Sequence, residues 1–367
     1  MNHITFFIPN LGYGGAERVT VNLLKALSEH DVVLDLVLTN LEAPSPSNYL
    51  DEVPRSVKVI NLATGRISNS ILPLANYIRE CQPHALISHL SYANVAAVFA
   101  KQLARTKTRL VLVEHNTVSA HKSTGFTSKL VKSLMKLTYP QAEFIVTVSE
   151  AASRDLEKYL GFESGRVKTI YNPIVGPDLF TKSNTSLDHP WFQSDSTPVF
   201  LAVGRLVELK DFSTLIQAFA LLRKVKNSRL VILGDGELRD ELENLAKALG
   251  ISEDVWLAGF VDNPYVYMRR ATALVLSSRS EGLPNVLIEA MACGCPVIST
   301  DCFSGPREIL DSGKYGALVP VGDVQAMSQA MLEVLEQSVN KQQLIQRALD
   351  IASFEKAASE YLELLDS

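Results

Sequence analysis

The sequence has no apolar run long enough to cross a membrane. A transmembrane helix needs about 20 consecutive, mostly apolar residues, and charged or polar residues interrupt every apolar stretch of this 367-residue chain well before that. The first residues, Met1 to Ile4, also lack the basic segment and long apolar core of a signal peptide and lead directly into a predicted strand. We therefore expect a cytoplasmic protein, either free or peripheral on the inner face of the cell membrane.

Cysteine is scarce as well. The chain has four cysteines, and Cys293, Cys295 and Cys302 lie close together without the paired C-x-x-C spacing of zinc sites. We interpret them as free thiols in a helix end and a strand, which are typical of a reducing compartment. The sequence therefore predicts no metal site at these cysteines.

The sequence also lacks a basic excess and low-complexity tracts. Its formal net charge is −5, which argues against nucleic acid as a partner. With 47% hydrophobic and 20% charged residues the composition is that of a globular protein, and the length allows two domains of ordinary size.

Short apolar runs alternate with longer helical patterns, which is typical of parallel α/β layers. The pattern runs through residues 1–175, stops in a polar stretch with several turn-forming residues at 176–198, and restarts over 199–350. We expect two Rossmann-like domains joined by a linker, followed by an amphipathic helix within 351–367. Ligands of such sheets bind beyond the carboxyl ends of the strands.

The most informative segment is 281–298. It predicts a loop, a short helix from Pro284 to Ala292 and a strand, with Gly294 ending the helix. Glu281 precedes the helix and Glu289 lies inside it among apolar residues, where an ionised carboxylate requires a hydrogen-bonding partner. Free N–H groups at the helix start, from Gly282 to Asn285, favour a phosphate. Carboxylates can accept hydrogen bonds from sugar hydroxyl groups, and backbone amides can bind phosphate. Their combination in this segment predicts a site for a sugar nucleotide.

Two glutamates separated by seven residues, with Gly282, Leu283, Pro284 and Asn285 after the first, resemble the signature of retaining glycosyltransferases of family 4. The resemblance implies the GT-B fold, in which two Rossmann-like domains face each other across a cleft. The first domain is then expected to bind the acceptor and the second the nucleotide sugar. The final helix is expected to pack back on the first domain. Glu281 would bind hydroxyls of the donor sugar, and Glu289 the ribose.

Arg205 and Lys210 follow a predicted strand at 199–203, and Asp211 is a candidate N-cap for the next helix. Both cations are expected at the carboxyl edge of the second sheet. The resemblance implies that they neutralise the donor diphosphate as it leaves. The alternative is a solvated loop with ordinary surface charges.

The segment 12–18 follows the first strand and contains Gly14 and Gly15. It is similar to a dinucleotide-binding G-x-G-x-x-G, but Glu17 stands in place of the third glycine, so we do not expect a nicotinamide enzyme. Small residues let the backbone approach a ligand closely. The resemblance places the donor phosphate and the acceptor against Gly14 and Gly15; the alternative is a structural turn.

Three further segments with candidate site residues follow predicted strands. His115 comes after the strand 110–113, and the resemblance implies a contact with the donor sugar, although a lone histidine is more often structural. Gly234 begins Gly-Asp-Gly-Glu, which is similar to a metal-binding Asp-x-Asp but opens a helix, so no metal is expected. By resemblance Gly234, Phe260 and Val261 border the nucleotide.

The resemblance implies a retaining glycosyltransferase that moves a hexose or N-acetylhexosamine, without a metal or other cofactor. By the same resemblance, UDP is the expected nucleotide and a glycan or lipid-linked glycan the expected acceptor, as in bacterial polysaccharide synthesis. No general base or nucleophile stands out, which agrees with a front-face mechanism. The alternatives are a UDP-sugar 2-epimerase and a non-catalytic subunit that binds nucleotide sugars for a partner transferase.

The stretch 126–137 is basic and amphipathic. Leu130, Leu134 and Leu137 share a helix face with Phe126, while lysines at 129, 132 and 136 lie off it. Such a helix could rest on an anionic membrane. A surface helix that packs only on its own domain is the alternative.

Overall fold

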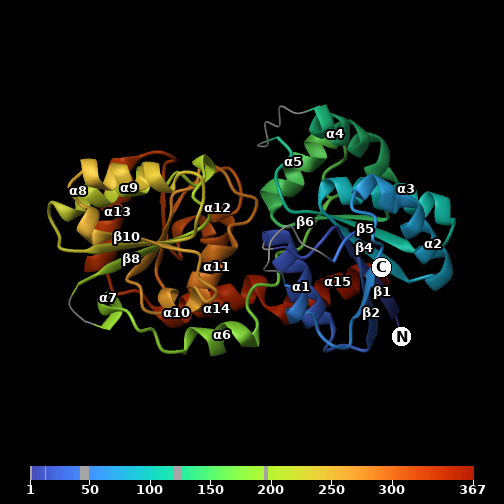
Figure 1. Ribbon diagram of the computed structural model, residues 1–367, viewed down its shortest axis with the longest axis horizontal. Coiled ribbons are helices and arrows are strands. Elements are labelled where there is room, and N and C mark those ends of the chain that lie inside the picture. Colours follow the sequence, from blue (N-terminus) through green and yellow to red (C-terminus); the bar gives the residue numbers. More distant parts are fainter. Residues whose placement is uncertain (1, 13, 42–48, 120–125, 194–196) are drawn as a thin grey trace. The chain divides into compact units, whose positions relative to one another are not determined.

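The computed structural model describes residues 2–12, 14–41, 49–119, 126–193 and 197–367. The chain forms two compact units. The first consists of Met1–Ile174 together with Phe354–Ser367, and the second of Val175–Ser353. Both contain a parallel sheet with helices (Figure 1).

The first unit has a parallel sheet in the order β3-β2-β1-β4-β5-β6-β7 among the described residues. Its central strands β1, β4, β5 and β6 are mostly buried apolar runs, as expected where helices cover both faces of a parallel sheet, whereas the edge strands β3 and β7 are largely exposed or half-buried. The strands are β1 (Asn2–Ile8), β2 (Val32–Leu38), β3 (Lys58–Asn61), β4 (Ala85–His89), β5 (Arg109–Glu114), β6 (Phe144–Thr147) and β7 (Lys168–Thr169). The helices are α1 (Gly15–Leu27), α2 (Ile71–Cys81), α3 (Ser91–Ala104), α4 (Phe126–Thr138), α5 (Glu150–Leu160) and α15 (Phe354–Asp366).

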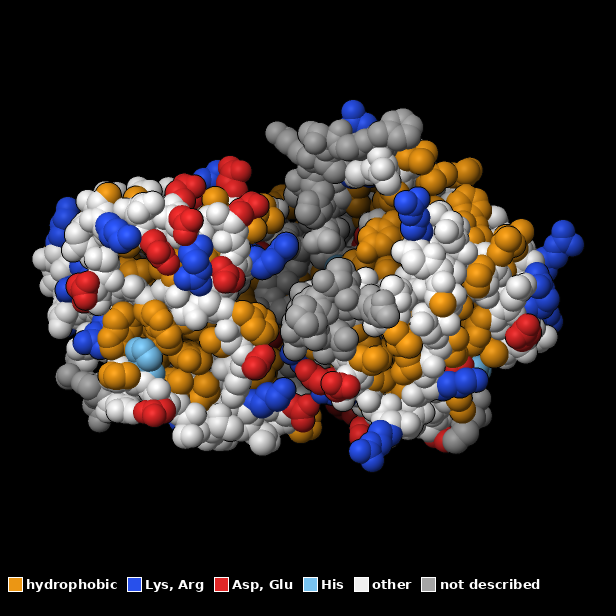
Figure 2. Space-filling model, viewed as in Figure 1, with side chains coloured by type: hydrophobic (Ala, Val, Ile, Leu, Met, Phe, Trp, Pro, Cys, Tyr) orange, Lys and Arg blue, Asp and Glu red, His pale blue; other side chains and the backbone are white. Residues whose placement is uncertain are grey.

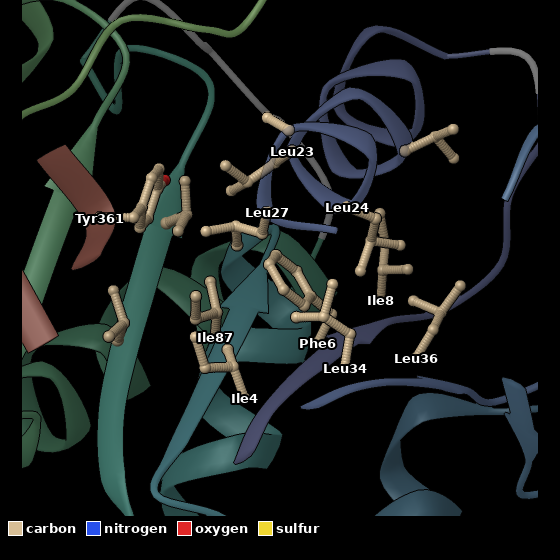
Figure 3. Packing of buried hydrophobic residues seen from close by; sticks show 14 of the residues in the cluster. Ile4, Phe6, Ile8, Leu23, Leu24, Leu27, Leu34, Leu36, Ile87 and Tyr361 are labelled. Carbon is tan, nitrogen blue, oxygen red and sulfur yellow. The ribbon is translucent and has the colours of Figure 1, made fainter. Parts of the chain in front are cut away.

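The C-terminal helix α15 packs on one face of the first sheet, beside α1. Its Ala358, Tyr361 and Leu365 are buried in the same apolar cluster as Phe6 and Leu27. Figure 3 shows Tyr361 close to side chains from this core. The last residues of the chain thus complete the core of the unit that contains its first residues.

The second unit repeats the architecture with a parallel sheet in the order β10-β9-β8-β11-β12-β13. Its strands are β8 (Val199–Val203), β9 (Arg229–Leu233), β10 (Val255–Gly259), β11 (Ala273–Leu276), β12 (Val297–Thr300) and β13 (Ala317–Val319). The helices are α6 (Pro177–Ser183), α7 (Pro190–Gln193), α8 (Phe212–Arg223), α9 (Arg239–Ala248), α10 (Tyr265–Met268), α11 (Asn285–Ala292), α12 (Pro306–Ile309), α13 (Val324–Glu336) and α14 (Lys341–Ala352). Strand order reverses between β8 and β11, so the carboxyl ends of these strands mark the switch point of the sheet.

The stretch 176–198, where the sequence predicts a linker, contains α6 and α7 and belongs to the second unit. His189 stacks on Trp256 of the edge strand β10, with ring centroids 4.2 Å apart, and Phe192 meets Tyr267 edge-on. Figure 2 shows hydrophobic side chains gathered around a histidine on this unit. Aromatic contacts, which have no sequence periodicity, hold this segment against the edge of the sheet.

None of the described helices is both long and apolar enough to cross a membrane.

Candidate active site

The loop after β8 presents the two cations that the sequence singles out. Arg205 is exposed directly beyond the strand. Lys210 ends a short 3-10 helix, Glu208–Lys210, and is half-buried. Asp211 stands at the start of α8 but does not cap it with its side chain. Its carboxylate instead accepts a hydrogen bond from Arg279 Nε at 3.1 Å, so Asp211 ties the loop after β8 to the loop after β11.

Lys210 and Glu281 form an ion pair across these loops. Lys210 Nζ lies 2.7 Å from Glu281 Oε1, and the two side chains are 23% and 12% exposed. Ser278 Oγ donates to the same carboxylate oxygen at 2.6 Å, and Ser277 Oγ donates to the carbonyl of Lys210 at 2.7 Å. The pair is therefore held in one geometry by both side-chain and backbone contacts.

The helix that follows Glu281 begins one residue later than the sequence predicts. Pro284 has φ −75° and ψ 85°, which is not helical, and α11 starts at Asn285. The segment is tied to the loop after β12, because Ser304 Oγ donates to the carbonyl of Gly282 at 2.7 Å. Gly305 has φ 92°, and a Cβ there would lie 2.3 Å from Pro284 Cδ. Close packing between the two loops thus fixes the bend at Pro284 and requires glycine at 305.

Fewer backbone N–H groups are open to a ligand at the start of α11 than the sequence predicts for Gly282 to Asn285. Pro284 has no N–H, and Asn285 N–H donates to the carbonyl of Leu283 at 2.9 Å. The expectation of open amides throughout 282–285 is therefore wrong for Asn285. Gly282 and Leu283 remain as the backbone donors that an anion could use at this end of α11.

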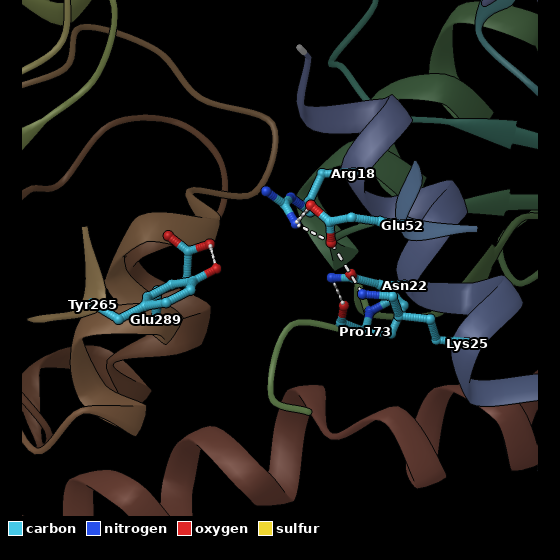
Figure 4. A network of polar contacts seen from close by, with 7 residues as sticks. All are labelled: Arg18, Asn22, Lys25, Glu52, Pro173, Tyr265 and Glu289. Atoms are coloured by element: carbon cyan, nitrogen blue, oxygen red, sulfur yellow. Dashed lines mark hydrogen bonds and ion pairs between the residues drawn. The ribbon is translucent and has the colours of Figure 1, made fainter. Parts of the chain in front are cut away.

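Glu289 lies within α11 and is half-buried. The hydroxyl of Tyr265, at the start of α10, lies 3.4 Å from Glu289 Oε1 (Figure 4). This long hydrogen bond provides the carboxylate with a polar partner among the apolar side chains of the helix.

Three glycine-containing loops pack against each other at the carboxyl ends of β8, β9 and β10. Gly234 N–H donates to the carbonyl of Gly259 at 2.7 Å, and a Cβ on Gly234 would lie 2.0 Å from the carbonyl oxygen of Gly204. Beyond Gly259, Phe260 is 62% exposed and Val261 is half-buried. The helix α9 begins only at Arg239, so the segment from Gly234 to Glu237 is a loop rather than a helix start.

In the first unit, His115 is joined to a second histidine. His115 directly follows β5, and its Nε2 lies 2.9 Å from Nδ1 of His89, the last residue of β4. The rings are stacked with centroids 5.2 Å apart. Burial lowers the pKa of His115 to about 4, and burial followed by the neighbouring His115 lowers that of His89 well below its usual value. Both rings are therefore neutral at pH 7.

The residue before His115 is held by a buried network. The Glu114 carboxylate accepts hydrogen bonds from Ser91 Oγ at 2.9 Å, Asn94 Nδ2 at 3.1 Å and the hydroxyl of Tyr139. Burial raises the pKa of Glu114 despite these bonds. The network anchors the end of β5, which fixes the backbone position of His115.

Gly14 and Gly15 start α1, with Gly14 as the N-cap residue. A Cβ on Gly14 would lie 2.1 Å from the Glu17 carboxylate, which folds back over this turn, whereas Gly15 has open space around it. Burial raises the pKa of Glu17. Figure 4 shows the next turns of α1, where Glu52 binds Arg18 and Lys25. The glycine turn is therefore followed by a helix that is firmly attached to its unit.

The comparisons with known proteins cover both units. A family model described as Glycosyltransferase Family 4 matches residues 13–175, and one described as Glycosyl transferases group 1 matches residues 186–350. A protein from Campylobacter jejuni named N-acetylgalactosamine-N,N'-diacetylbacillosaminyl-diphospho-undecaprenol 4-alpha-N-acetylgalactosaminyltransferase is 33% identical over 99% of this chain and 100% of its own length. The chain belongs to glycosyltransferase family 4.

A further relative and a solved structure agree with this family assignment and with the fold. A second Campylobacter jejuni protein, named as an alpha-1,4-N-acetyl-D-galactosaminyltransferase, is 29% identical over 95% of this chain and 93% of its own. The crystal structure of HepE from Anabaena in complex with UDP matches all of this chain and all of its own with a TM-score of 0.78 at 19% identity. The predicted α/β GT-B fold is confirmed, and the protein is a glycosyltransferase.

Several polar partners of the predicted site residues are not predicted from the sequence. Ser278 lies at the carboxyl end of β11 and His89 at that of β4, both positions at which parallel sheets bind ligands. That placement was the available signal for these two residues. Tyr265 lies in a four-residue helix after β10 and had no comparable signal.

The basic helix α4 is amphipathic in an unexpected orientation. Met135 is buried and Val131 and Leu134 pack on the core, while Leu130 and Leu137 are 48% and 62% exposed. Phe126 begins the helix, but its side chain lies outside the described residues. Two leucines of the predicted apolar face are thus on the surface.

Proposed function

We propose that this protein is a retaining, metal-independent glycosyltransferase that moves an N-acetylhexosamine or hexose from a UDP-sugar to a lipid-linked glycan. The observation that carries the proposal is the Lys210–Glu281 ion pair at the carboxyl edge of the second sheet, next to the start of α11. The pair combines a cation for phosphate with a carboxylate for sugar hydroxyls in one fixed arrangement.

In this proposal the second unit binds the donor. Arg205 and Lys210 neutralise the diphosphate, assisted by the N–H groups of Gly282 and Leu283 and the positive end of the α11 dipole. Arg205 is exposed, and Lys210 keeps Glu281 as its partner until the phosphate competes for the ammonium group. The two protein cations thereby do the work that a divalent cation does in other transferases.

The carboxylates recognise hydroxyl groups. Glu281 accepts hydrogen bonds from the donor sugar through the oxygen atoms that Lys210 and Ser278 leave available. Glu289 accepts from the ribose, with the hydroxyl of Tyr265 orienting it. Gly234, Phe260 and Val261 border the nucleotide, and Pro284 and Asn285 shape the turn that carries the amides.

The reaction requires no protein base in this proposal. The bond between the anomeric carbon and the phosphate oxygen breaks while a bond to the acceptor oxygen forms on the same face of the sugar. The acceptor hydroxyl transfers its proton to the departing diphosphate. His115, in the first unit, donates a hydrogen bond to the donor sugar, and the open backbone at Gly14 and Gly15 receives the acceptor and the donor phosphate.

The names of the relatives support the acceptor and the linkage. Both Campylobacter jejuni proteins are named for alpha-1,4 or 4-alpha transfer of N-acetylgalactosamine to undecaprenol diphosphate-linked amino sugars. A transferase that retains the anomeric configuration of an alpha-linked UDP-sugar forms an alpha-linked product. HepE in complex with UDP and with UDP-glucose supports UDP as the nucleotide.

A polyprenyl acceptor requires access to a membrane surface, and α4 is our candidate for that contact. Leu130 and Leu137 are exposed on the same helix as Lys129 and Lys136, which are also exposed. Apolar side chains flanked by lysines bind at the interface of an anionic bilayer.

The proposal is tested by incubating the protein with UDP-N-acetylgalactosamine, UDP-N-acetylglucosamine, UDP-galactose or UDP-glucose and a polyprenyl-diphosphate amino sugar, in EDTA. We expect a glycolipid product from one donor, with an alpha linkage by NMR. A beta product would contradict retention. Release of an epimerised sugar nucleotide in the absence of an acceptor would contradict glycosyl transfer.

A further inference from the structure

His89 is buried at the end of β4 and is hydrogen-bonded to His115 through one ring nitrogen of each residue. Its side chain is 0% exposed, and its ring also stacks on Phe6, with centroids 5.9 Å apart. Its Nδ1 lies 2.9 Å from His115 Nε2, whereas its Nε2 is buried and has no hydrogen-bond partner among the described residues. Because two neutral rings meet, one nitrogen of the pair donates and the other accepts.

The unpartnered Nε2 of His89 decides which ring donates. If His115 donated from Nε2, His89 would have its own proton on Nε2, leaving a buried N–H without an acceptor. If His89 donates from Nδ1, its Nε2 is only a bare acceptor. In folded proteins, buried N–H groups without an acceptor are rarer than buried acceptors without a donor. Leaving a buried donor without a hydrogen bond costs free energy. The second arrangement is therefore favoured.

We infer that His89 is a positioning residue: it donates its Nδ1 proton to His115 Nε2 and thereby holds His115 as the tautomer whose proton is on Nδ1. His115 then presents an N–H donor to its ligand, which must supply an acceptor such as a sugar hydroxyl oxygen. The identity of that ligand rests on the function proposed above, but the tautomer does not.

The surroundings favour this neutral arrangement. No carboxylate is hydrogen-bonded to either ring in the described part of the chain, and the adjacent Glu114 is engaged by Ser91, Asn94 and Tyr139 instead. Among the described residues His115 has no hydrogen-bonded acidic partner that would stabilise an imidazolium ion, and burial disfavours that charge. The pair thus serves as an uncharged hydrogen-bond relay with fixed direction.

The tautomer is tested directly by long-range ¹H–¹⁵N correlation NMR of the full protein with ¹⁵N-labelled histidine at pH 7. The His115 signals are assigned from their loss in His115→Asn, with His30→Asn as a matched control. We expect a protonated Nδ1 and a bare Nε2 for His115, and the same protonation pattern for His89. Protonated Nε2 on His115 would overturn the inference, whatever the activity of the enzyme.

Kinetics then test whether His89 acts through His115. His89→Phe keeps the stacked ring but removes the donor, and we expect kcat/KM for the donor sugar to fall about tenfold, as for one lost hydrogen bond. His89→Asn, whose amide can donate from nearly the same place, should recover most of that loss. In a His115→Phe background, His89→Phe should have no further effect.

The outcomes separate the two claims. Additive losses in the double variant, or equal losses for His89→Asn and His89→Phe with an unchanged fold, would show that His89 has only a structural role. If His115→Phe alone leaves kcat/KM unchanged, the proposed donor contact of His115 fails, while the NMR result still decides the tautomer.

Discussion

The carboxyl edges of the two sheets use opposite electrostatics. At the edge of the first unit, His89 and Glu114 are buried and His115 is half-buried, and desolvation shifts the pKa of each toward its neutral form. At the edge of the second unit, Arg205, Lys210 and Glu281 reach the surface or lie near it, and Lys210 and Glu281 form an ion pair. Two parallel sheets with the same order of their first six strands thus present different electrostatics at their carboxyl edges.

The difference agrees with the division of labour that we propose. A departing diphosphate carries developing negative charge, which fixed cations stabilise better in the transition state than in the ground state. Sugar hydroxyls are uncharged, and neutral donors with fixed direction suffice to recognise them. The comparison therefore predicts large effects of charge changes in the second unit and smaller effects in the first.

The largest effect is expected for Lys210→Ala. Removing the cation at the leaving phosphate should lower kcat by about 10²–10³-fold, the range for loss of one preorganised charge-stabilising donor. Steady-state kinetics with saturating donor measure this, and Lys247→Ala, an exposed lysine of α9, is the control. Near-normal kcat with an intact fold would remove Lys210 from the leaving-group role.

Glu281→Gln should come next. Glutamine keeps a side chain of the same size that can bond to Ser278 and a sugar hydroxyl, but it loses the ion pair with Lys210. We expect about a 10²-fold loss in kcat/KM, similar to other transition-state contacts of charged groups. Glu208→Gln is the control, because the Glu208 side chain is 87% exposed and its ion pair is a weak surface contact, with Oε1 3.8 Å from Arg279 Nη1. Equal activity of Glu281→Gln and the parent would contradict a role for the charge.

The buried histidines predict acid sensitivity of the first unit. The unfolded chain protonates His115 near pH 6.5 and the folded chain only near pH 4, so the folded state binds fewer protons between these values and loses stability as the pH falls. This loss reaches about 3 kcal/mol at pH 4 for one such group. The raised pKa of Glu114 acts in the opposite direction, so variants are needed to isolate the histidines.

Urea unfolding at pH 6.5 and 4.5 measures the effect. Both tryptophans, Trp191 and Trp256, belong to the second unit, so their fluorescence reports that unit, while far-UV circular dichroism reports both. Acid should shift the dichroism transition to lower urea more than the fluorescence transition. The variant His89→Phe/His115→Phe should reduce this difference, and an unchanged difference would exclude the pair as its cause.

The smallest effect concerns the membrane. Lys129→Glu together with Lys136→Glu should weaken binding to anionic vesicles about tenfold or more at low salt, since each basic residue near such a surface contributes about 1 kcal/mol. Lys158→Glu, an exposed lysine of α5, is the control. Vesicle sedimentation measures binding, which should weaken as salt increases. Equal binding of all variants would contradict a role for α4.

The sequence predicts the strands well, because buried parallel strands are continuous apolar runs. The polar residues that follow these strands lead us to propose the carboxyl edge of the second sheet as the donor site. Prediction from the sequence fails where contacts join distant segments. Pro284 is outside its helix because of packing against Gly305, and Asp211 binds Arg279 instead of capping α8. His89 and His115 are 26 residues apart, and only the pairing of β4 with β5 brings them together.

We propose that the second unit binds a nucleotide diphosphate through protein cations alone. Isothermal titration of the full protein with UDP and UDP-N-acetylgalactosamine, in EDTA and in magnesium, tests it most directly. We expect equal affinity under both conditions and clearly weaker binding by Arg205→Ala and Lys210→Ala. Binding that requires magnesium, or that is unchanged in both variants, would contradict it.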